Sequence, residues 1–499
     1  MSKTDVILVS PPSRTKSPRP PLGLMYLSSY LEREGITADI VDIKGYPDKE
    51  IFDKIIESIK KANPIMVGIT CLSPEVEEVI SISKEIKKKI DCYVVVGGVH
   101  PTVSPQDFLG STSPVDFVVI GEGELTLTEL LKTVKNEQDL WNVPGIAWFN
   151  DDQIVRTKSR LPINNLDELP FPAFKKVPMN YYTFPNIYAV RGILLSAFFI
   201  FTSRGCPFRC KFCSNKSVFG RRVRHRSAKN VVDEIEYLVN NYRIDGFYIY
   251  DDTFTINKQH VLNICEELIS RKLDLIWGCE TRTDLISEEI IKKMKQAGCI
   301  QIDFGVESGS QRILDILKKD ITVSQIKNAF NICQKFHIRR FANFMINTPG
   351  ETEEDIQKTI NLAKELNATL NIFNVTTPFP GTDLYKEIET KLSPKDYSKM
   401  ASKISFKEFI EFIESRCKFS QHNINLDVLL TDLWKEFPNV QDLSFRLNKS
   451  YVKGIIKELL FVVDMKYLKV INKSKRKKEY LKWLMDIILK KEKQSGNKL

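Results

Sequence analysis

The stretch SRGCPFRCKFC, residues 203–213, places three cysteines at C-x3-C-x2-C spacing directly after the apolar, strand-forming run 197–202. Thiolates select zinc or iron–sulfur clusters among biological metals. Three thiolates in one short loop can hold three irons of a four-iron cluster and leave the fourth iron open. Zinc motifs usually contain two C-x2-C pairs, or one pair followed by histidines. No second pair follows here, so we expect Cys206, Cys210 and Cys213 to bind a four-iron cluster, with a zinc site as the alternative.

The bulk composition predicts a chain of several domains in a reducing compartment. At 499 residues the chain is longer than one ordinary core needs, so two or three domains are expected. The first residues lead straight into a strand-like run and predict no secretory signal. Ten cysteines without a framework of regular pairs fit the cytoplasm, and an oxygen-sensitive cluster would suit an anaerobic setting there.

The positive charge is concentrated at the end of the chain. Residues 471–499 contain ten Lys or Arg and three Asp or Glu, so this tail carries +7 of the net charge of +10. The rest is nearly balanced, which argues against a broad nucleic-acid surface. Apolar residues recur in the tail at helical spacing: Tyr480, Leu481, Leu484, Ile487 and Ile488. Such a helix either lies on an anionic membrane as a peripheral contact or packs its apolar face on the protein.

The cysteine loop resembles that of the radical S-adenosylmethionine (SAM) superfamily. Phe212, an aromatic residue just before the third cysteine, matches the usual C-x3-C-x-aromatic-C form. The resemblance implies that the open iron chelates the amino and carboxylate groups of SAM. One electron from the cluster then splits SAM and yields a 5′-deoxyadenosyl radical, while the protein binds and shields both cofactors. An electron donor such as flavodoxin or ferredoxin is implied as a partner.

Residues 1–143 are expected to form an α/β domain of the flavodoxin-like, doubly wound type. Strands alternating with helices of about a dozen residues indicate βαβ units and a parallel sheet. The expected strands are 6–9, 38–41, 66–70, 93–96 and 117–120, and the expected helices are 22–34, 48–61, 75–88 and 124–134. Ligands on this architecture bind at the carboxyl ends of the strands.

Glycine-rich segments follow these strands and resemble those of a cobalamin-binding domain. The segments are GGVHPT at 97–102 and GEGE at 121–124, and no G-x-G-x-x-G follows the first strand. No histidine precedes His100, so the familiar D-x-H-x-x-G pattern is absent and the resemblance implies cobalamin without a protein histidine on the lower face of cobalt. The expected cobalamin contacts are Ser73, Gly97, Gly98, Gly121 and Glu122, together with His100, which either bonds corrin amides or caps the next turn. The alternative is a structural domain without a cofactor.

Two further domains and a connector are expected. Residues 144–192 contain a hairpin, with strands at 145–149 and 153–156, and a linker rich in helix breakers. Residues 193–385 repeat strand and helix six times and predict a partial (β/α)6 barrel, with strands at 197–202, 246–250, 275–278, 300–306, 341–346 and 369–376. Residues 386–499 are expected to form a helical, basic C-terminal domain.

Polar or glycine-rich groups follow every barrel strand, where barrel enzymes place their sites. The resemblance assigns the SAM contacts to Phe212, Asp251, Asp252, Arg282, Glu307, Ser308 and Gly350. Asp251 and Asp252 are expected to bind the SAM ammonium, or else to cap a helix. Arg282 meets the SAM carboxylate or forms a plain salt bridge. Glu307 and Ser308 are expected at the ribose, and Gly350 beside adenine.

The resemblance to cobalamin-dependent radical SAM enzymes covers residues 5–385 and sets the expected function. This class includes anaerobic Mg-protoporphyrin ester cyclases, hopanoid methylases and carbon or phosphorus methyltransferases. We expect the enzyme to methylate an unactivated carbon, using the deoxyadenosyl radical, methylcobalamin and a second SAM. The first alternative is an oxidative cyclase or rearrangement enzyme, and the remote one a non-catalytic zinc, nucleic-acid or membrane-binding protein. We expect the aromatic residues at 181–184 and the helical C-terminus to shape the substrate pocket, and together with the basic tail they suggest a small, apolar or lipid-like substrate.

Overall fold

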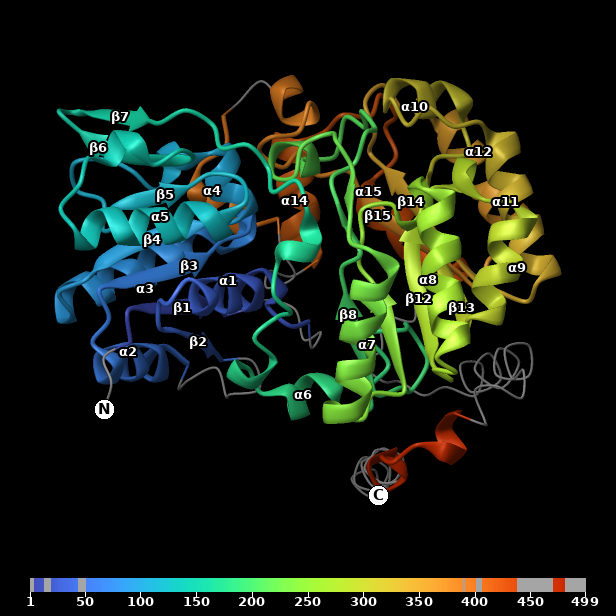
Figure 1. The fold of residues 1–499 in the computed structure, drawn as a ribbon. Helices are drawn as coiled ribbons and strands as arrows, with labels where there is room; N and C mark the ends of the chain where they lie inside the picture. Colours follow the sequence, from blue (N-terminus) through green and yellow to red (C-terminus); the bar gives the residue numbers. More distant parts are fainter. Residues whose placement is uncertain are drawn as a thin grey trace, which may run out of the picture.

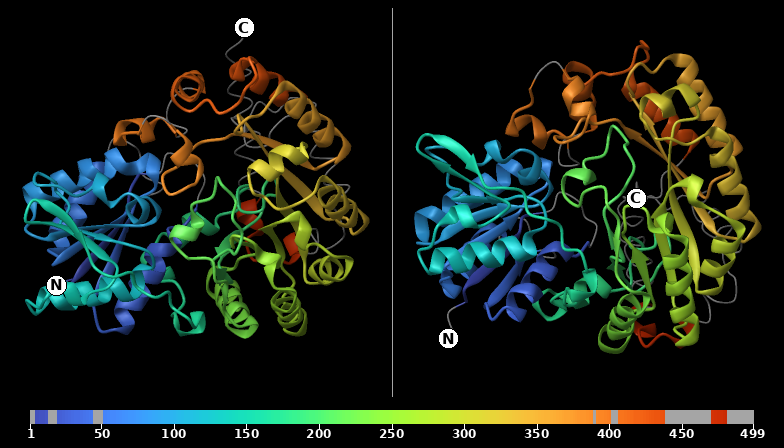
Figure 2. Two further views of the ribbon diagram at one scale, coloured as in Figure 1. Left: turned by 90° about the horizontal axis from the view of Figure 1, so that it is seen from above. Right: turned by 45° about the horizontal axis from the view of Figure 1, so that its top comes forward.

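The computed structural model describes residues 4–12, 19–43, 51–388, 391–400, 406–437 and 470–480. Two sheets with their own helices lie side by side, the N-terminal one in blue and the barrel in green and yellow (Figure 1). Orange helices of the C-terminal part lie across both units in the two views of Figure 2. This arrangement brings the carboxyl ends of the N-terminal strands opposite the cysteine loop.

The N-terminal sheet has the strand order β2-β1-β3-β4-β5-β6-β7. Its strands are β1 (Val6–Ser10), β2 (Ala38–Asp42), β3 (Met66–Thr70), β4 (Tyr93–Gly97), β5 (Phe117–Val119), β6 (Ile146–Asn150) and β7 (Gln153–Arg156). The first five are parallel in the expected flavodoxin-like order 2-1-3-4-5. The prediction of a doubly wound domain is therefore confirmed.

Helices cover both faces of this sheet. They are α1 (Leu22–Arg33), α2 (Ile51–Ala62), α3 (Val76–Lys89), the short α4 (Val99–Val103) and α5 (Gly123–Lys135). Helix α1 packs beside α5, and α2 packs beside α3. Along β1, Val6 and Leu8 belong to one apolar cluster while Ile7 and Val9 belong to another. A strand buried on both faces has no polar alternation, which explains why these strands are continuous apolar runs.

The predicted hairpin is present but extends the N-terminal sheet. Strand β6 pairs antiparallel with β5, with Phe117 opposite Trp148, and β7 pairs antiparallel with β6. The first structural unit thus continues past residue 143, where we expected its end.

The barrel sheet contains six parallel strands in the order β15-β14-β13-β12-β11-β8. These are β8 (Ala197–Ile200), β11 (Gly246–Ile249), β12 (Ile276–Thr281), β13 (Cys299–Glu307), β14 (Arg339–Ile346) and β15 (Leu370–Val375). Its helices are α7 (Ala228–Tyr242), α8 (Lys258–Ser270), α9 (Glu288–Gln296), α10 (Gln311–Ile316), α11 (Val323–Lys335) and α12 (Glu353–Glu365). Within the described residues, β8 and β15 do not pair with each other, so the barrel is partial as predicted.

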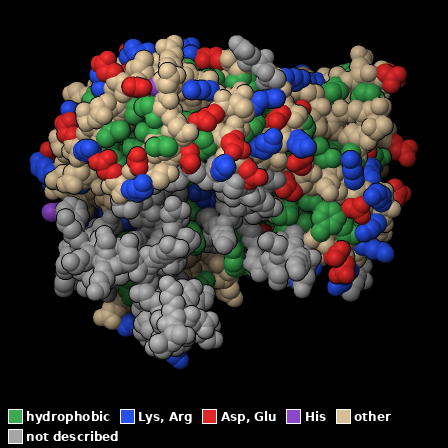
Figure 3. Space-filling model, turned by 180° about the vertical axis from the view of Figure 1, so that it is seen from behind, with side chains coloured by type: hydrophobic (Ala, Val, Ile, Leu, Met, Phe, Trp, Pro, Cys, Tyr) green, Lys and Arg blue, Asp and Glu red, His purple; other side chains and the backbone are tan. Residues whose placement is uncertain are grey.

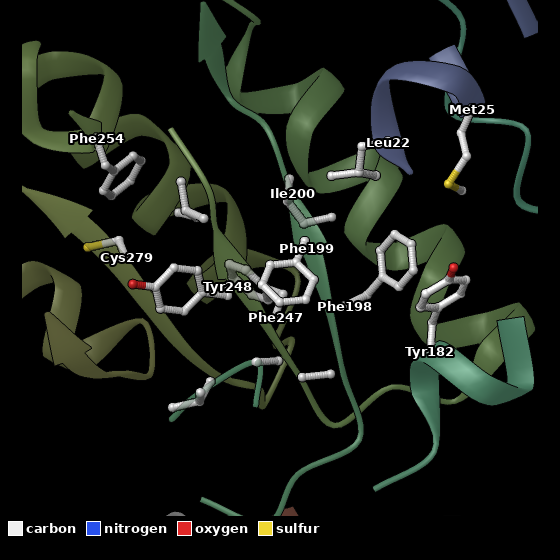
Figure 4. Packing of buried hydrophobic residues seen from close by; sticks show 14 of the residues in the cluster. Leu22, Met25, Tyr182, Phe198, Phe199, Ile200, Phe247, Tyr248, Phe254 and Cys279 are labelled. Atoms are coloured by element: carbon white, nitrogen blue, oxygen red, sulfur yellow. The ribbon is translucent and has the colours of Figure 1, made fainter. Parts of the chain in front are cut away.

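The outer face of the first barrel strand packs against the N-terminal unit. In Figure 4, Phe198 of β8 lies beside Leu22 and Met25 of α1 and beside Tyr182 of the short helix α6 (Met179–Thr183). Phe198 and Tyr182 are both almost completely buried. One continuous apolar cluster therefore joins the two sheets and fixes their relative position.

Helix α6 corrects the expectation that residues 181–184 shape the substrate pocket. The Tyr182 hydroxyl donates to Asp42, and the Thr183 carbonyl accepts a hydrogen bond from Ser196 Oγ at 2.7 Å. Ser196 directly precedes β8, so these aromatics lie at the amino end of the barrel, opposite the cysteine loop. Barrel sites form at the carboxyl ends, so these residues serve packing.

The C-terminal part contains α13 (Pro394–Ser398), α14 (Phe406–Arg416) and α15 (Leu426–Glu436). Helix α13 packs on α3 of the N-terminal unit, while α15 packs on β15 of the barrel. Charged side chains of both signs intermingle on the described part of the face in Figure 3. None of the helices in the described part of the chain is both long and apolar enough to cross a membrane.

The beginning of the basic tail docks on the amino end of the barrel. The hydroxyls of Ser474 and Tyr480 donate to Asp245 Oδ2 at 2.7 and 2.8 Å, and Arg476 donates to the Thr183 carbonyl at 3.1 Å. Tyr480 is buried and so is not available to a membrane. The other expected members of the tail helix, Leu481, Leu484, Ile487 and Ile488, lie outside the described residues.

Candidate active site

The cysteine loop is held on three sides by backbone hydrogen bonds. Cys206 N–H donates to the Gly220 carbonyl, Lys211 N–H donates to the Leu317 carbonyl, and the Lys211 carbonyl accepts from Leu384 N–H. Gly205 has φ +98°, and a side chain there would collide with the Arg222 carbonyl oxygen. Glycine is therefore required for the loop to turn out of β9 (Ser203–Arg204), which pairs with β10 (Arg224–His225).

Exposure separates the three motif cysteines from the other seven. Cys206, Cys210 and Cys213 are partly exposed, whereas Cys71, Cys92, Cys265, Cys279, Cys299, Cys333 and Cys417 are buried, as expected of core cysteines. Accessible thiols on one short, rigid loop are what a cluster needs. The donor set therefore fits an iron–sulfur cluster held by Cys206, Cys210 and Cys213.

Two buried cations lie near the middle cysteine. Arg282 Nη1 is 3.9 Å from Cys210 Sγ, and its guanidinium stacks over the Phe208 ring at 3.6 Å. Burial raises the pKa of Cys210, and the charges of Lys319 and Arg282 oppose that rise. Positive charge beside a thiolate stabilises it, so both residues favour the ligand form of Cys210. Lys319 has no sequence signal and was missed.

The Asp251 and Asp252 pair divides into two roles. Asp251 is buried and accepts backbone N–H bonds from Thr202 and Ser203 at 2.7 and 3.2 Å, as well as their hydroxyls. It therefore pins the chain entering the cysteine loop and has no lone pair left for SAM. The side chain of Asp252 is exposed, and Asn215 donates to it. Although part of Asp252 reaches solvent, the protein around its carboxyl group removes much of its hydration, and this desolvation together with the Asp251 charge raises the pKa of Asp252 to about 6.

The alternative role of this pair as a helix cap is wrong. Helix α8 begins after Asn257, whose side chain accepts from His260 N–H, and the preceding 3-10 turn starts after Thr253 without a side-chain cap. Asp252 therefore remains a candidate for the SAM ammonium, while Asp251 acts as a structural anchor.

Of the remaining expected SAM contacts, some are engaged by other side chains of the protein and others stay open to a ligand. Glu307 has φ +64° and forms an ion pair with Lys319 Nζ at 2.7 Å, while Phe212 lies 5.7 Å from the same nitrogen. Ser308 is buried and its Oγ lies 3.0 Å from Thr359 Oγ1, so it serves the turn. Gly350 has φ +68°, a left-handed conformation that favours glycine, while a Cβ atom there would make only ordinary contacts at 3.8 Å and beyond.

Arg282 takes the role that we offered as the alternative. Its guanidinium forms a salt bridge with Asp284, with Nε 2.9 Å from Oδ1. It also donates to the Asp320 carbonyl at 3.3 Å. These bonds hold the guanidinium beside Cys210.

A cavity of about 390 Å³ separates the N-terminal strand ends from the cysteine loop. Four expected cobalamin contacts line it: Gly97, Gly98, Gly121 and Glu122. Its opposite wall is formed by Cys213 to Asn215 together with Val218 and Phe219. One hollow thus touches both the strand ends and Cys213 of the cysteine loop.

Ser73 and His100 do not line this cavity. His100 is fully buried, with Nδ1 2.9 Å from Ser73 Oγ and Nε2 3.0 Å from Asp107 Oδ2. Its ring packs edge-on against Tyr397 of α13. Both residues therefore fasten α13 to the N-terminal unit, and the expectation that they contact cobalamin is not supported.

The shape of the cavity fits cobalamin. One part of it is an apolar slot between β1, β3, β4, β5, α1 and α5, lined by Leu8, Leu24, Leu27, Val95, Val119 and Leu127. Gly68 and Gly123 leave room there, since a Cβ atom at either would meet a leucine at 3.0–3.1 Å. Gly98 (φ +108°) and Gly121 (φ +80°) keep the rim open. An apolar slot with glycines at its rim would suit a flat aromatic group such as that of the cobalamin nucleotide tail, which these residues would then hold.

A buried ion cluster ties the N-terminal unit to the strands that flank the cysteine loop. Glu122 Oε1 lies 3.2 Å from Arg204 of β9 and 2.8 Å from Arg224 of β10, and Glu124 lies 2.7 Å from Arg204. Burial alone would raise the pKa of Glu122, but Arg224 and Arg204 together lower it. The sequence predicted Glu122 as a cofactor contact, whereas its carboxylate is occupied by these arginines.

Glu122→Gln is expected to destabilise the contact between the two units. Breaking a buried ion pair leaves uncompensated charge and costs about 3–5 kcal/mol. The measurement is the first unfolding transition in scanning calorimetry. The matched control is Glu354→Gln, whose exposed pair with Lys358 should contribute less than about 1 kcal/mol. Equal shifts for the two variants would contradict the role of Glu122.

Comparisons with known proteins agree with this geometry. Residues 200–363 match the family model of the Radical SAM superfamily, and residues 14–131 match that of the B12 binding domain. The radical SAM domain implies a four-iron cluster with SAM, and the B12-binding domain implies cobalamin. An uncharacterized methyltransferase of Pyrococcus horikoshii is 34% identical over 77% of this chain and 83% of its own length. The anaerobic magnesium-protoporphyrin IX monomethyl ester cyclase of Rubrivivax gelatinosus is 31% identical over 76% of this chain and 68% of its own.

A solved structure shares the fold over almost the whole chain. It is the radical SAM methyltransferase TsrM of Kitasatospora setae with tryptophan and a SAM analogue bound. The TM-score is 0.69 at 20% identity, covering 93% of this chain and 96% of that one. The sequence identities and the two domain models together show that this chain belongs to the radical SAM enzymes with an N-terminal B12-binding domain.

Proposed function

We propose that this protein methylates an unactivated carbon of a small molecule. The observation that supports it best is the cavity shared by the N-terminal strand ends and the cysteine loop, because a cobalamin bound there would lie beside Cys213. The curated methyltransferase relative adds support. When bound, the cluster and SAM supply a radical that removes a hydrogen atom, and methylcobalamin supplies the methyl group.

The chain's own residues position these groups. Cys206, Cys210 and Cys213 bind iron, and Asp251 holds the entry to their loop in place. Asp252 is the candidate for the SAM ammonium, Gly350 lies at the expected adenine loop, and Glu307 stays a candidate for the ribose. Gly97, Gly98 and Gly121 form the cobalamin rim. The ion pairs of Glu122 with Arg204 and Arg224 hold the two walls of the cavity in place relative to each other.

Oxidative cyclisation is the second candidate, because a cyclase relative matches 68% of its own length. Both reactions use the same cofactors, and both require an electron donor such as flavodoxin or ferredoxin. We infer a cytoplasmic, anaerobic setting from the oxygen-sensitive cluster. The product distinguishes the two reactions, since methylation adds one CH2 and cyclisation adds none.

The test is anaerobic reconstitution with iron, sulfide and hydroxocobalamin, followed by incubation with SAM, a reductant and candidate substrates. We expect retained cobalt, and one 5′-deoxyadenosine and one S-adenosylhomocysteine per methylated product, measured by mass spectrometry. Formation of 5′-deoxyadenosine without S-adenosylhomocysteine would favour the cyclase. Zinc in place of iron, or no cleavage of SAM, would refute both.

A further inference from the structure

The three motif cysteines lie in a single loop whose two ends are paired with each other. Strands β9 and β10 pair antiparallel, so the chain between them, residues 205–223, leaves the barrel and returns beside its own start. A Cβ atom at Gly205 would lie 2.4 Å from the Arg222 carbonyl oxygen, and Cys206 N–H donates to the Gly220 carbonyl at 3.3 Å. The returning limb therefore lies against the backbone that leads into the first cysteine.

Other parts of the protein cover three sides of this loop. Residues 213–215 and 218–219 line the cavity that faces the N-terminal strand ends. On the barrel side, the Arg282 guanidinium stacks on an aromatic ring of the loop at 3.6 Å. On a third side, Lys211 Nζ lies 2.7 Å from Glu387, in the segment that follows β15. The exposed side chains of the loop therefore show from which direction a large molecule can reach it.

Arginines dominate the exposed part of the loop. Its exposed residues are Pro207, Arg209, Arg221 and Arg222. Within the described residues, Arg221 and Arg222 have no ion-pair partner, whereas Arg209 lies 3.7 Å from Asp320 with both side chains more than half exposed. An ion pair this exposed contributes little, so all three arginines are available to a binding partner.

The other cations of this stretch are already neutralised. Residues 203–226 contain eight Lys or Arg and no Asp or Glu. Five of the eight form ion pairs with acids from other parts of the chain: Arg204, Lys211, Lys216, Arg224 and Arg226. The positive charge that remains belongs to the three exposed arginines, and it faces solvent beside Cys206.

We propose that an acidic electron-carrier protein docks on the exposed side of the cysteine loop, with its carboxylates on Arg209, Arg221 and Arg222. This assignment rests on the proposed function, since it names the partner that supplies the electron for cleavage of SAM. The reduced flavin or iron–sulfur centre of the carrier loses one electron, and the cluster gains it. A carrier seated there lies against the backbone at Cys206, so the electron crosses only the loop. Redox encounters use small interfaces, and complementary charge speeds their formation.

Other anionic occupants fit these arginines less well. Nucleic acid and an anionic membrane need a broad basic footprint, whereas the charge of the chain outside the tail 471–499 is nearly balanced. An anionic group of bound cobalamin would lie in the cavity, but Arg221 and Arg222 do not line it. An acidic protein needs only a small, local patch of positive charge, which is what the loop presents.

The first test is titration calorimetry of the reconstituted holoenzyme with oxidised flavodoxin, an acidic carrier that has no electron to donate in this state. In about 0.05 M salt, the double variant Arg221→Gln/Arg222→Gln should bind it about fivefold or more weakly, because two complementary charges are lost. In about 1 M salt the difference should vanish, since the Debye length falls to about 3 Å. The variant Arg221→Lys/Arg222→Lys keeps both charges and should keep most of the affinity.

The matched control is Arg156→Gln/Arg243→Gln, which removes the same charge from two exposed arginines elsewhere. Arg156 lies on the edge strand β7, and Arg243 follows α7 at the amino end of the barrel, opposite the loop. This variant should bind flavodoxin as the unaltered protein does. The comparison separates contact with the loop from the effect of net charge.

Electron transfer gives a second readout. Reduced methyl viologen is a small cation and needs no docking surface, whereas reduced flavodoxin does. With flavodoxin below saturation, Arg221→Gln/Arg222→Gln should form 5′-deoxyadenosine about fivefold or more slowly. With methyl viologen its rate should equal that of the unaltered protein. A merely structural role of the arginines would slow both reactions alike.

Several outcomes would overturn the docking surface. Unchanged binding of flavodoxin, or a loss of binding that persists in high salt, would place the carrier elsewhere. An equal loss of rate with both reductants would assign the arginines to the loop itself, and less cobalt retained after desalting would assign them to cobalamin. A protein that binds flavodoxin and takes up its electron, but forms no 5′-deoxyadenosine with either reductant, would refute the proposed function and leave the docking surface in place.

Discussion

Cys210→Ala is expected to abolish cleavage of SAM while leaving the fold intact. A four-iron cluster on this loop has three protein ligands, and no other cysteine of the chain can replace one because the other seven are buried elsewhere. Cys210 is partly exposed, so its removal creates no closed cavity in the core. The measurements are iron content, the visible absorption of the cluster, and 5′-deoxyadenosine formed with a reductant. All three should fall to the level of protein that has not been reconstituted.

The matched control for this variant is Cys92→Ala. This change also removes one thiol, but Cys92 lies just before β4 and is only 7% exposed, away from the cysteine loop. It should retain the iron content and SAM cleavage of the unaltered protein, with only a modest loss of stability. If Cys210→Ala kept its iron and still formed 5′-deoxyadenosine, the assignment of the loop as the cluster site would be wrong.

The strands could be predicted because they rest on local signals, whereas their order followed only from the flavodoxin-like type that alternating strands and helices indicate. Runs such as 6–9 and 66–69 lack polar side chains, and the helices between the strands begin and end within three residues of their expected limits. The cysteine spacing and the glycines at 97–98 and 121 likewise indicated the correct ends of the correct strands.

Side-chain direction could not be predicted in the same way. Asp251, Ser308 and His100 follow the right strands, but each turns toward the backbone or a neighbouring element. A shift of one residue along a strand exchanges the two faces, so Asp251 and Asp252 were indistinguishable in the sequence.

Contacts between distant segments were invisible for another reason. Lys319 meets Glu307 across a turn, and Glu122 meets Arg204 across 82 positions of sequence. A single sequence carries no information on such pairs, and they make up most of what the site adds to the motifs.

Gly68→Val is expected to prevent cobalamin binding without disturbing the cluster. Gly68 of β3 lies in register between Leu8 of β1 and Val95 of β4, and all three line the apolar slot. A Cβ atom at Gly68 would already lie 3.0 Å from Leu8 Cδ2, and the two further methyls of valine would project into the slot. Valine is favoured in strands, so β3 itself should persist. Cobalamin retained after desalting should fall about tenfold or more, since one lost well-packed contact of 1.4 kcal/mol already costs that factor.

The iron–sulfur cluster of the same Gly68→Val protein shows whether the loss is specific to cobalamin. Iron content and formation of 5′-deoxyadenosine should stay as in the unaltered protein, because the cysteine loop lies on the other wall of the cavity. Gly110→Val is the matched control, since no atom lies within 4 Å of a Cβ atom there and the residue is outside the slot. Loss of both cofactors in Gly68→Val would indicate general misfolding. Normal cobalamin content in a folded Gly68→Val protein would mean that the slot is not the cobalamin site, and the methyl-transfer proposal would lose the observation that carries it.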